Sequence, residues 1–139
     1  VHGGIPTKGK IINNFSKEDI ENPDNETIYE FLWNDPWEND ENLENFERGV
    51  GYFFGKNTTK NFLNTFKFKC IIRSHEPRKI LLSEQNRMVV TVGSCIYPYG
   101  LDKAGFLEIN FNEKINNGND VIKKFGKIFS KENLKFNVS

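Results

Sequence analysis

The chain has 139 residues, of which 37% are hydrophobic and 27% charged, and its 19 basic and 19 acidic residues give a net charge of zero. Zero net charge argues against a protein that attracts nucleic acid or a membrane surface by bulk electrostatics, so we expect neither kind of partner. No apolar run reaches the roughly 18 residues of a membrane span, and the length suits one domain or part of a larger one.

The first predicted helix lies in the N-terminal third of the chain. Residues 5–24 hold two prolines and many polar residues, which favours a long loop with one helical turn near Ser16. Asn25 or Thr27 is placed to cap a helix that runs through IYEFLW. The helix should end at residues 34–36, Asn-Asp-Pro, because the residue before a proline avoids the helical region.

A second helix is predicted after an aromatic turn. The acidic stretch 37–47 shows no strand alternation, so we expect a surface loop there. Residues 48–55, RGVGYFFG, combine three glycines with an aromatic cluster, which indicates a turn that leads into a buried segment. Thr58 or Thr59 should cap the helix over residues 59–66, whose apolar side chains share one face.

Three strands are predicted in the remainder of the chain. Residues 70–74 and 88–92 contain continuous apolar runs, so these strands should be central and buried. Residues 105–111 alternate apolar and polar side chains, which predicts one face toward water. After Asn112 the chain is rich in lysine and asparagine, with one weak amphipathic patch at 121–129.

These elements are too few to enclose an ordinary core. Three strands and two helices would have to cover thirteen phenylalanines, and the GGI opening resembles the end of a strand. We therefore expect the chain to be the C-terminal part of a larger domain. Cys70 and Cys95 both lie in apolar runs, which favours buried free thiols in a reducing compartment and a cytoplasmic location.

Two histidines are the first candidates for chemistry. His2 precedes two glycines, which let the backbone approach an ion or substrate closely. His75 follows the apolar run 70–74, at a strand end where α/β proteins place ligands. Neutral imidazole is a common metal ligand. Taken singly, each histidine is better explained as an ordinary core or surface residue, and two histidines alone do not make a metal site.

Arginines are the next candidates. Arg48 stands before a glycine-flanked turn, where a guanidinium can offer a two-pronged contact to phosphate. Taken alone, Arg48 is better explained as a surface residue paired with Glu44 or Glu47. Arg73 lies within a strand, so a salt bridge is expected for it. No histidine is spaced from Ser94 as a base from a nucleophile, so the sequence gives no ground for covalent catalysis.

These features occur in an order that resembles one family. The segments are HGGIP at 2–6, LWNDP at 32–36, RGVGYFFG at 48–55, FL at 62–63, IIRSHE at 71–76 and TVGS at 91–94. Together they resemble the PPP family of metal-dependent serine/threonine phosphatases, which belong to the calcineurin-like metallophosphoesterases. The resemblance covers about residues 1–112, as the C-terminal part of the catalytic domain, and leaves 113–139 as an extension or tail. It implies an α/β sandwich of two packed mixed sheets flanked by helices, of which this chain carries mainly the C-terminal sheet.

The resemblance also implies roles for individual residues. His2 and His75 match two histidines that bind the same one of two divalent metal ions, which are manganese, iron or zinc. Arg48 matches the arginine that binds the substrate phosphate, and Asp35 matches an aspartate near the rim of the active site. Tyr97 is our choice for the tyrosine that lines the site. Tyr99 is the alternative, because the family pattern after TVGS fits only with a gap.

The implied activity is removal of phosphate from phosphoserine and phosphothreonine by a metal-activated water. The implied partners are a phosphorylated protein or peptide and a regulatory protein. The family signatures with the other metal ligands are absent here, so we expect the chain alone to be inactive. The altered stretch after Thr91 leaves open another phosphoester, such as a dinucleoside polyphosphate. A third alternative is a non-catalytic binding module on the same fold.

Overall fold

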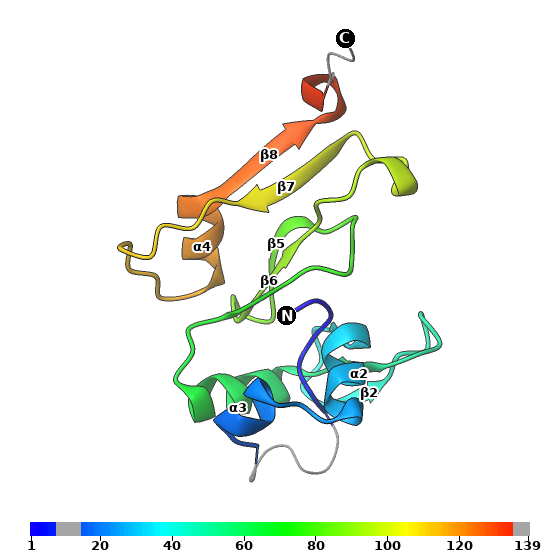
Figure 1. The fold of residues 1–139 in the computed structure, drawn as a ribbon, viewed down its shortest axis with the longest axis vertical. Helices are drawn as coiled ribbons and strands as arrows, with labels where there is room; N and C mark the ends of the chain where they lie inside the picture. Colours follow the sequence, from blue (N-terminus) through cyan, green and yellow to red (C-terminus); the bar gives the residue numbers. More distant parts are fainter. Residues whose placement is uncertain (8–14, 135–139) are drawn as a thin grey trace.

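A computed structural model describes residues 1–7 and 15–134 as a mixed α/β fold. In Figure 1, the N-terminal helices and short strands form the lower part, β5 and β6 cross the middle, and β7, β8 and α4 form the upper part. No helix in these two ranges is both long and apolar enough to cross a bilayer. The elements in chain order are α1 (Lys17–Glu21), α2 (Asn25–Trp33), β1 (Asp35–Pro36), β2 (Leu43–Glu44), β3 (Tyr52–Phe54), α3 (Lys56–Phe66), β4 (Ile71–Arg73), β5 (Ile80–Glu84), β6 (Val89–Val92), the 3-10 helix η1 (Tyr97–Tyr99), β7 (Lys103–Leu107), α4 (Gly118–Phe125), β8 (Gly126–Ser130) and the 3-10 helix η2 (Lys131–Leu134).

The described strands form three small sheets. The first has the order β1-β3-β2, with β1 parallel and β2 antiparallel to β3. The second has the order β4-β6-β5, again with one parallel and one antiparallel neighbour. The third is the antiparallel pair β7-β8. Mixed pairing in two of the sheets agrees with the mixed sheets that the sequence predicts.

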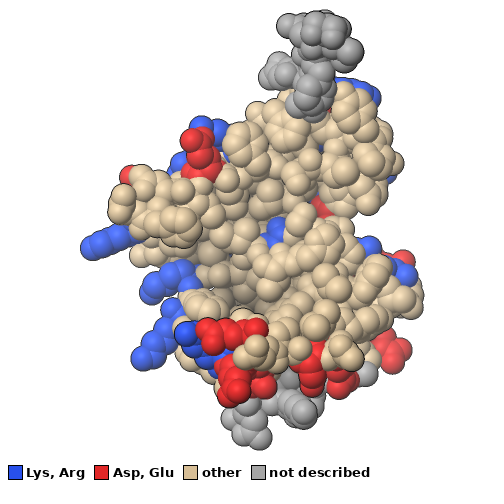
Figure 2. Space-filling model, viewed as in Figure 1, with Lys and Arg blue, Asp and Glu red and all other residues tan. Residues whose placement is uncertain are grey.

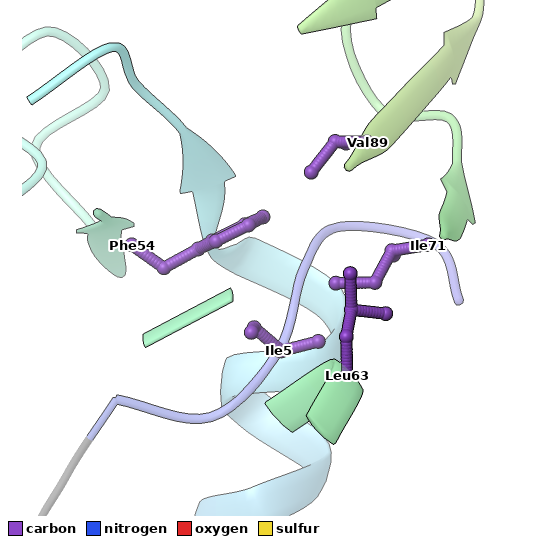
Figure 3. Packing of buried hydrophobic residues seen from close by; sticks show 5 residues of the cluster. All are labelled: Ile5, Phe54, Leu63, Ile71 and Val89. Carbon is purple, nitrogen blue, oxygen red and sulfur yellow. The ribbon is translucent and has the colours of Figure 1, made fainter. Parts of the chain in front are cut away.

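Strand β6 lies between two hydrophobic clusters. Val89 packs on one side with Ile5, Phe54, Leu63 and Ile71, as Figure 3 shows. Val90, the next residue, packs in a second cluster that is closed by α4. Both valines are 0% exposed. A strand covered on both faces needs apolar residues at successive positions, which explains the continuous run in MVVTV.

The predicted helices are present, but other residues cap them. α2 begins after Asp24, whose side chain accepts a hydrogen bond from the Thr27 N–H, so neither Asn25 nor Thr27 is the cap. α3 starts at Lys56, after Gly55, earlier than the predicted caps Thr58 and Thr59. The amide oxygen of Asn42, from another loop, accepts hydrogen bonds from the Gly55 N–H and the Thr58 hydroxyl. Sequence propensity does not reveal a partner supplied from outside the helix.

The loop predicted over 5–24 is only partly described, since residues 8–14 lie outside the described ranges. The helical turn expected near Ser16 is α1, and Ser16 caps it in a reciprocal capping box with Asp19. The acidic stretch 37–47 is mostly loop, as predicted, but it includes the short strand β2. The pairing of β2 with β3 turns residues 45–51 into a hairpin connection.

The predicted strands 70–74 and 88–92 correspond to β4 and β6. β6 is central, whereas β4 is at the edge of its sheet among the described strands. The third prediction is shifted, because β7 ends at Leu107 and Phe111 beyond it is 94% exposed. β5 was not predicted. It carries a register shift and Leu81 at φ 60°, which disturbs the alternation that marks a strand.

The segment after Asn112, expected as an extension or tail, packs back onto the sheets. Its amphipathic patch divides at Gly126 into α4 and β8. Val121 and Phe125 of α4 are buried against Val90, and β8 pairs with β7. Residues 135–139 lie outside the described ranges.

Of the two cysteines, Cys70 is half-buried, and burial raises the pKa of its thiol. Cys95 is exposed, which corrects its expected burial.

Candidate active site

The first residues of the chain run beside the end of β4. The Ser74 N–H donates to the carbonyl of His2 at 2.9 Å, and the Arg73 Nε donates to the carbonyl of Gly3 at 2.5 Å. The Gly3 N–H donates in turn to the carbonyl of Phe31 in α2 at 2.7 Å. These bonds bring His2, from the start of the chain, to the strand end that carries His75.

The two histidine rings lie together. Their centroids are 4.8 Å apart with planes tilted by 41°, and the Trp33 and His75 rings form a T-shaped pair with centroids 5.5 Å apart. This proximity is what two ligands of one metal ion require, since histidine–metal bonds are about 2.0–2.1 Å long. That they bind a metal stays a prediction.

His75 carries two unusual features. Its backbone lies in the left-handed region at φ 71°, which costs free energy in a residue other than glycine and is concentrated at functional sites. Its Nδ1 atom is buried and has no hydrogen-bond partner in the described structure, although Asp35 Oδ1 lies 3.4 Å away. Burial lowers the pKa of His75, the positive charge of Arg48 adds to this effect, and the charge of Asp35 opposes it. The imidazole is therefore held toward its neutral form, which is the form that binds metals.

Asp35 connects the histidines to two arginines. Arg73 Nη2 donates to Oδ1 at 2.6 Å, and Arg48 Nε donates to Oδ2 at 2.9 Å. The side chain of Asp35 is 4% exposed and that of Arg73 is 0% exposed. Burial opposes ionisation of Asp35, yet the hydrogen bond from Arg48 and the charges of Arg73 and Arg48 hold the pKa of its carboxyl below the usual value. Asp35 is thus a buried carboxylate with two guanidinium partners.

Only part of the Arg48 guanidinium is bonded to other groups of the described protein. Its partner is Asp35, neither Glu44 nor Glu47, and its side chain remains 30% exposed. The side-chain bonds that it makes to described residues use its Nε and leave the two terminal NH2 groups for a further acceptor. A guanidinium held at Nε presents those groups as a planar fork, which suits a phosphate.

The predicted tyrosines lie elsewhere on the surface. Tyr97 and Tyr99 belong to η1 and are 59% and 49% exposed. The ammonium of Lys131 lies over the Tyr97 ring, 5.4 Å from its centroid. Among the described residues, no hydrogen bond, ion pair or ring contact joins Tyr97 to Asp35, Arg48 or the histidines. Its catalytic role is therefore a prediction that the geometry does not strengthen.

The donor atoms of the two histidines suit a metal ion. The unpartnered Nδ1 of His75 beside the His2 ring fits a divalent ion, because imidazole nitrogens are common ligands of such ions. Within residues 1–7 and 15–134, no three His, Cys, Asp or Glu side chains are grouped so as to hold a metal ion. The described residues thus fit part of a metal centre.

Sequence reasoning missed two members of this site. Arg73 was expected in a salt bridge and has one, but its position beneath Asp35 was not foreseen. Asn45 was not singled out at all, although it is 3% exposed and donates to Asp35 Oδ2 at 2.8 Å. Asn45 lies in an acidic, loop-like stretch in which no pattern distinguishes it from its neighbours.

The chain is similar in sequence to protein phosphatases. A protein phosphatase 2A catalytic subunit of Dictyostelium discoideum is 35% identical over 78 residues, which are 55% of this chain and 25% of that protein. Serine/threonine-protein phosphatase with EF-hands 1 of Homo sapiens is 28% identical over 111 residues, which are 78% of this chain and 16% of that protein. Serine/threonine-protein phosphatase T of Saccharomyces cerevisiae is 35% identical over 81 residues, 56% of this chain and 16% of that protein. The chain thus spans a quarter or less of these relatives.

The fold is also similar to that of a protein phosphatase. A solved protein serine/threonine phosphatase from Saccharomyces cerevisiae, with similarity to human phosphatase PP5, superposes with a TM-score of 0.69 at 25% sequence identity. The match covers 93% of this chain and 42% of that chain. The predicted α/β metallophosphoesterase fold is confirmed by this match. No family model matches the chain.

Proposed function

We propose that this chain, which resembles the PPP-family serine/threonine phosphatases in sequence and in fold, forms part of the catalytic domain of a metal-dependent protein phosphatase. The relatives named above carry this activity in their names, and the predicted resemblance to them is confirmed. The observation that carries the proposal for this chain is the partly exposed fork of Arg48, held on Asp35 beside the paired rings of His2 and His75.

In the proposed reaction, the Arg48 fork binds two oxygens of a phosphoserine or phosphothreonine phosphate. Its positive charge stabilises the negative charge that grows on the phosphoryl group in the transition state. Asp35 and the buried Arg73 hold the fork in place, so that little reorganisation is needed when substrate binds. His2 and His75 are the proposed ligands of one of two divalent ions, manganese, iron or zinc. Bound ions of this kind supply an activated water and neutralise phosphate charge.

The remaining metal ligands are proposed to come from outside this chain. A two-metal phosphatase centre needs bridging oxygen ligands, and the described residues contribute two imidazoles to it.

We further propose a phosphorylated protein or peptide as substrate, a regulatory protein as partner, and a cytoplasmic location. Figure 2 shows Lys and Arg at the left edge of the visible face and Asp and Glu along its lower edge beside them, with a broad, mostly uncharged stretch above. Zero net charge supports the expectation that neither nucleic acid nor a membrane is a partner.

A metal-content measurement tests the assigned ligands. In the whole protein that contains this chain, His2→Ala and His75→Ala should each remove about half of the bound divalent metal, because both histidines serve one of two ions. Each variant should also lower manganese-dependent hydrolysis of a phosphothreonine peptide by at least about tenfold. Elemental analysis after gel filtration gives the metal content independently of turnover. Full metal content in both variants would overturn the ligand assignment.

The chain alone is a second test. Purified residues 1–139 should show no manganese-dependent hydrolysis of p-nitrophenyl phosphate, because a catalytic metal site needs about three protein ligands and an open position. The comparison is a His2→Ala/His75→Ala double variant of the same chain. Turnover that is present in the chain and absent in the double variant would mean that the site is complete without further ligands.

A further inference from the structure

Asn45 is the first residue of the connection between β2 and β3, and its main chain bonds to two later residues of that connection. Its N–H donates to the carbonyl of Gly51 at 3.1 Å, and its carbonyl accepts from the Gly49 N–H at 2.8 Å. Gly49 and Gly51 have φ values of 74° and 73°, a region in which glycine costs least, and they allow the chain to turn this tightly. Arg48 lies inside this closed connection.

The side chain of Asn45 holds Arg48 at two places. Its Oδ1 accepts the backbone N–H of Arg48 at 3.0 Å. Its Nδ2 donates at 2.8 Å to Asp35 Oδ2, the same oxygen that accepts from Arg48 Nε at 2.9 Å. One buried amide therefore fixes both the main chain of the arginine and the carboxylate that orients its guanidinium.

We infer that Asn45 is a positioning residue for phosphate binding, which sets where the free fork of Arg48 lies. This inference rests on the proposed function. An arginine side chain is long and has many rotamers, so a fork that is fixed before substrate arrives loses less entropy on binding. The amide of Asn45 is bonded to Arg48 and Asp35, and the residue is 3% exposed, so we place it behind the fork and not in contact with the phosphate.

If Asn45 only stabilised the fold, its loss would lower stability without a specific effect on phosphate binding. A matched control variant distinguishes this role from a positioning role. Asn42 lies three positions earlier, and its Oδ1 also accepts two hydrogen bonds, from the Gly55 N–H and the Thr58 hydroxyl. Asn42 lies just before β2, outside the connection 45–51, and it joins its loop to the start of α3. No hydrogen bond or ion pair among the described residues links it to Asp35 or Arg48. Asn42→Ala removes a comparable set of bonds, whereas only Asn45→Ala releases the arginine.

The experiment measures competitive inhibition of the whole protein by inorganic phosphate. Asn45→Ala should raise the inhibition constant about tenfold, the effect of one lost orienting hydrogen bond. Asn42→Ala should leave that constant within about twofold while lowering thermal stability to a similar degree. Equal inhibition constants in Asn45→Ala and the parent would overturn the inference, as would equal increases in the Asn45 and Asn42 variants.

A double-mutant cycle sharpens the test. If Asn45 acts through Arg48, adding Asn45→Ala to Arg48→Ala should change the inhibition constant little further, so that the two effects are far from additive. Additive effects would mean that Asn45 does not act through the arginine. The proposed function fails separately, if the parent protein hydrolyses no phosphopeptide or if Arg48→Ala leaves phosphate inhibition unchanged. Suppose instead that the parent hydrolyses a phosphopeptide, that Arg48→Ala raises the inhibition constant for phosphate, and that Asn45→Ala leaves it unchanged. This result would overturn the inference about Asn45 and leave the proposed function standing.

Discussion

Arg48→Ala should lower kcat/KM of the whole protein for a phosphopeptide by about two orders of magnitude or more. The alanine variant loses the fork that carries charge to the transition state, and single contacts of this kind are worth about 10²–10³ in rate. The fold should change little, because the Arg48 side chain is 30% exposed and Asp35 keeps Arg73 and Asn45 as partners. Steady-state kinetics together with a thermal unfolding curve distinguish the two effects.

Two further variants control the Arg48 experiment. Arg48→Lys retains the positive charge but not the planar fork, so it should recover only part of the lost kcat/KM. Arg78→Ala removes an exposed guanidinium three positions after His75 and should stay within about twofold of the parent. If Arg48→Ala also stays within a few-fold of the parent, its phosphate-binding role is wrong.

Asp35→Ala should lower the free energy of unfolding by about 3–5 kcal/mol, the usual cost of removing one partner of a buried ion pair. Asp35 and Arg73 have side chains that are 4% and 0% exposed, so water cannot replace the lost carboxylate. The variant leaves Arg73 with Glu76, the Gly3 carbonyl and the Thr91 hydroxyl as partners. Urea denaturation of the parent and the variant measures the difference.

An exposed ion pair provides the control for Asp35. Lys124 Nζ lies 3.0 Å from Glu113 Oε2, with the two side chains 41% and 49% exposed. Glu113→Ala should therefore cost less than about 1 kcal/mol, because solvent screens the pair. If Asp35→Ala costs no more than Glu113→Ala, the buried network around Asp35 does not stabilise the fold as proposed.

The site shows what local sequence can and cannot decide. Near Arg48, the sequence offers Glu44 and Glu47 as partners, and reasoning from sequence distance favours them. In the structure, Arg48 pairs with Asp35, thirteen positions away. The β2–β3 connection turns the arginine toward β1, and β1 is the parallel neighbour of β3. The choice of partner therefore depends on strand pairing, which charge spacing does not encode.

The sequence by itself determined the order of the motifs from HGGIP to TVGS, the family they resemble, and the central strand β6. Each of these depends on neighbouring residues: an apolar run covered on both faces, or a short segment read in order. Tertiary structure alone decided that Asn45 holds Arg48, that Asn42 supports the start of α3, and that β5 and β8 are strands. The bond from Asn45 to Asp35, the support of α3 by Asn42 and the pairing of β8 with β7 join residues ten or more positions apart, and such partners are fixed only when the sheets and helices pack together. β5 pairs with the neighbouring strand β6, but its register shift at Leu81 hides the strand alternation in the sequence.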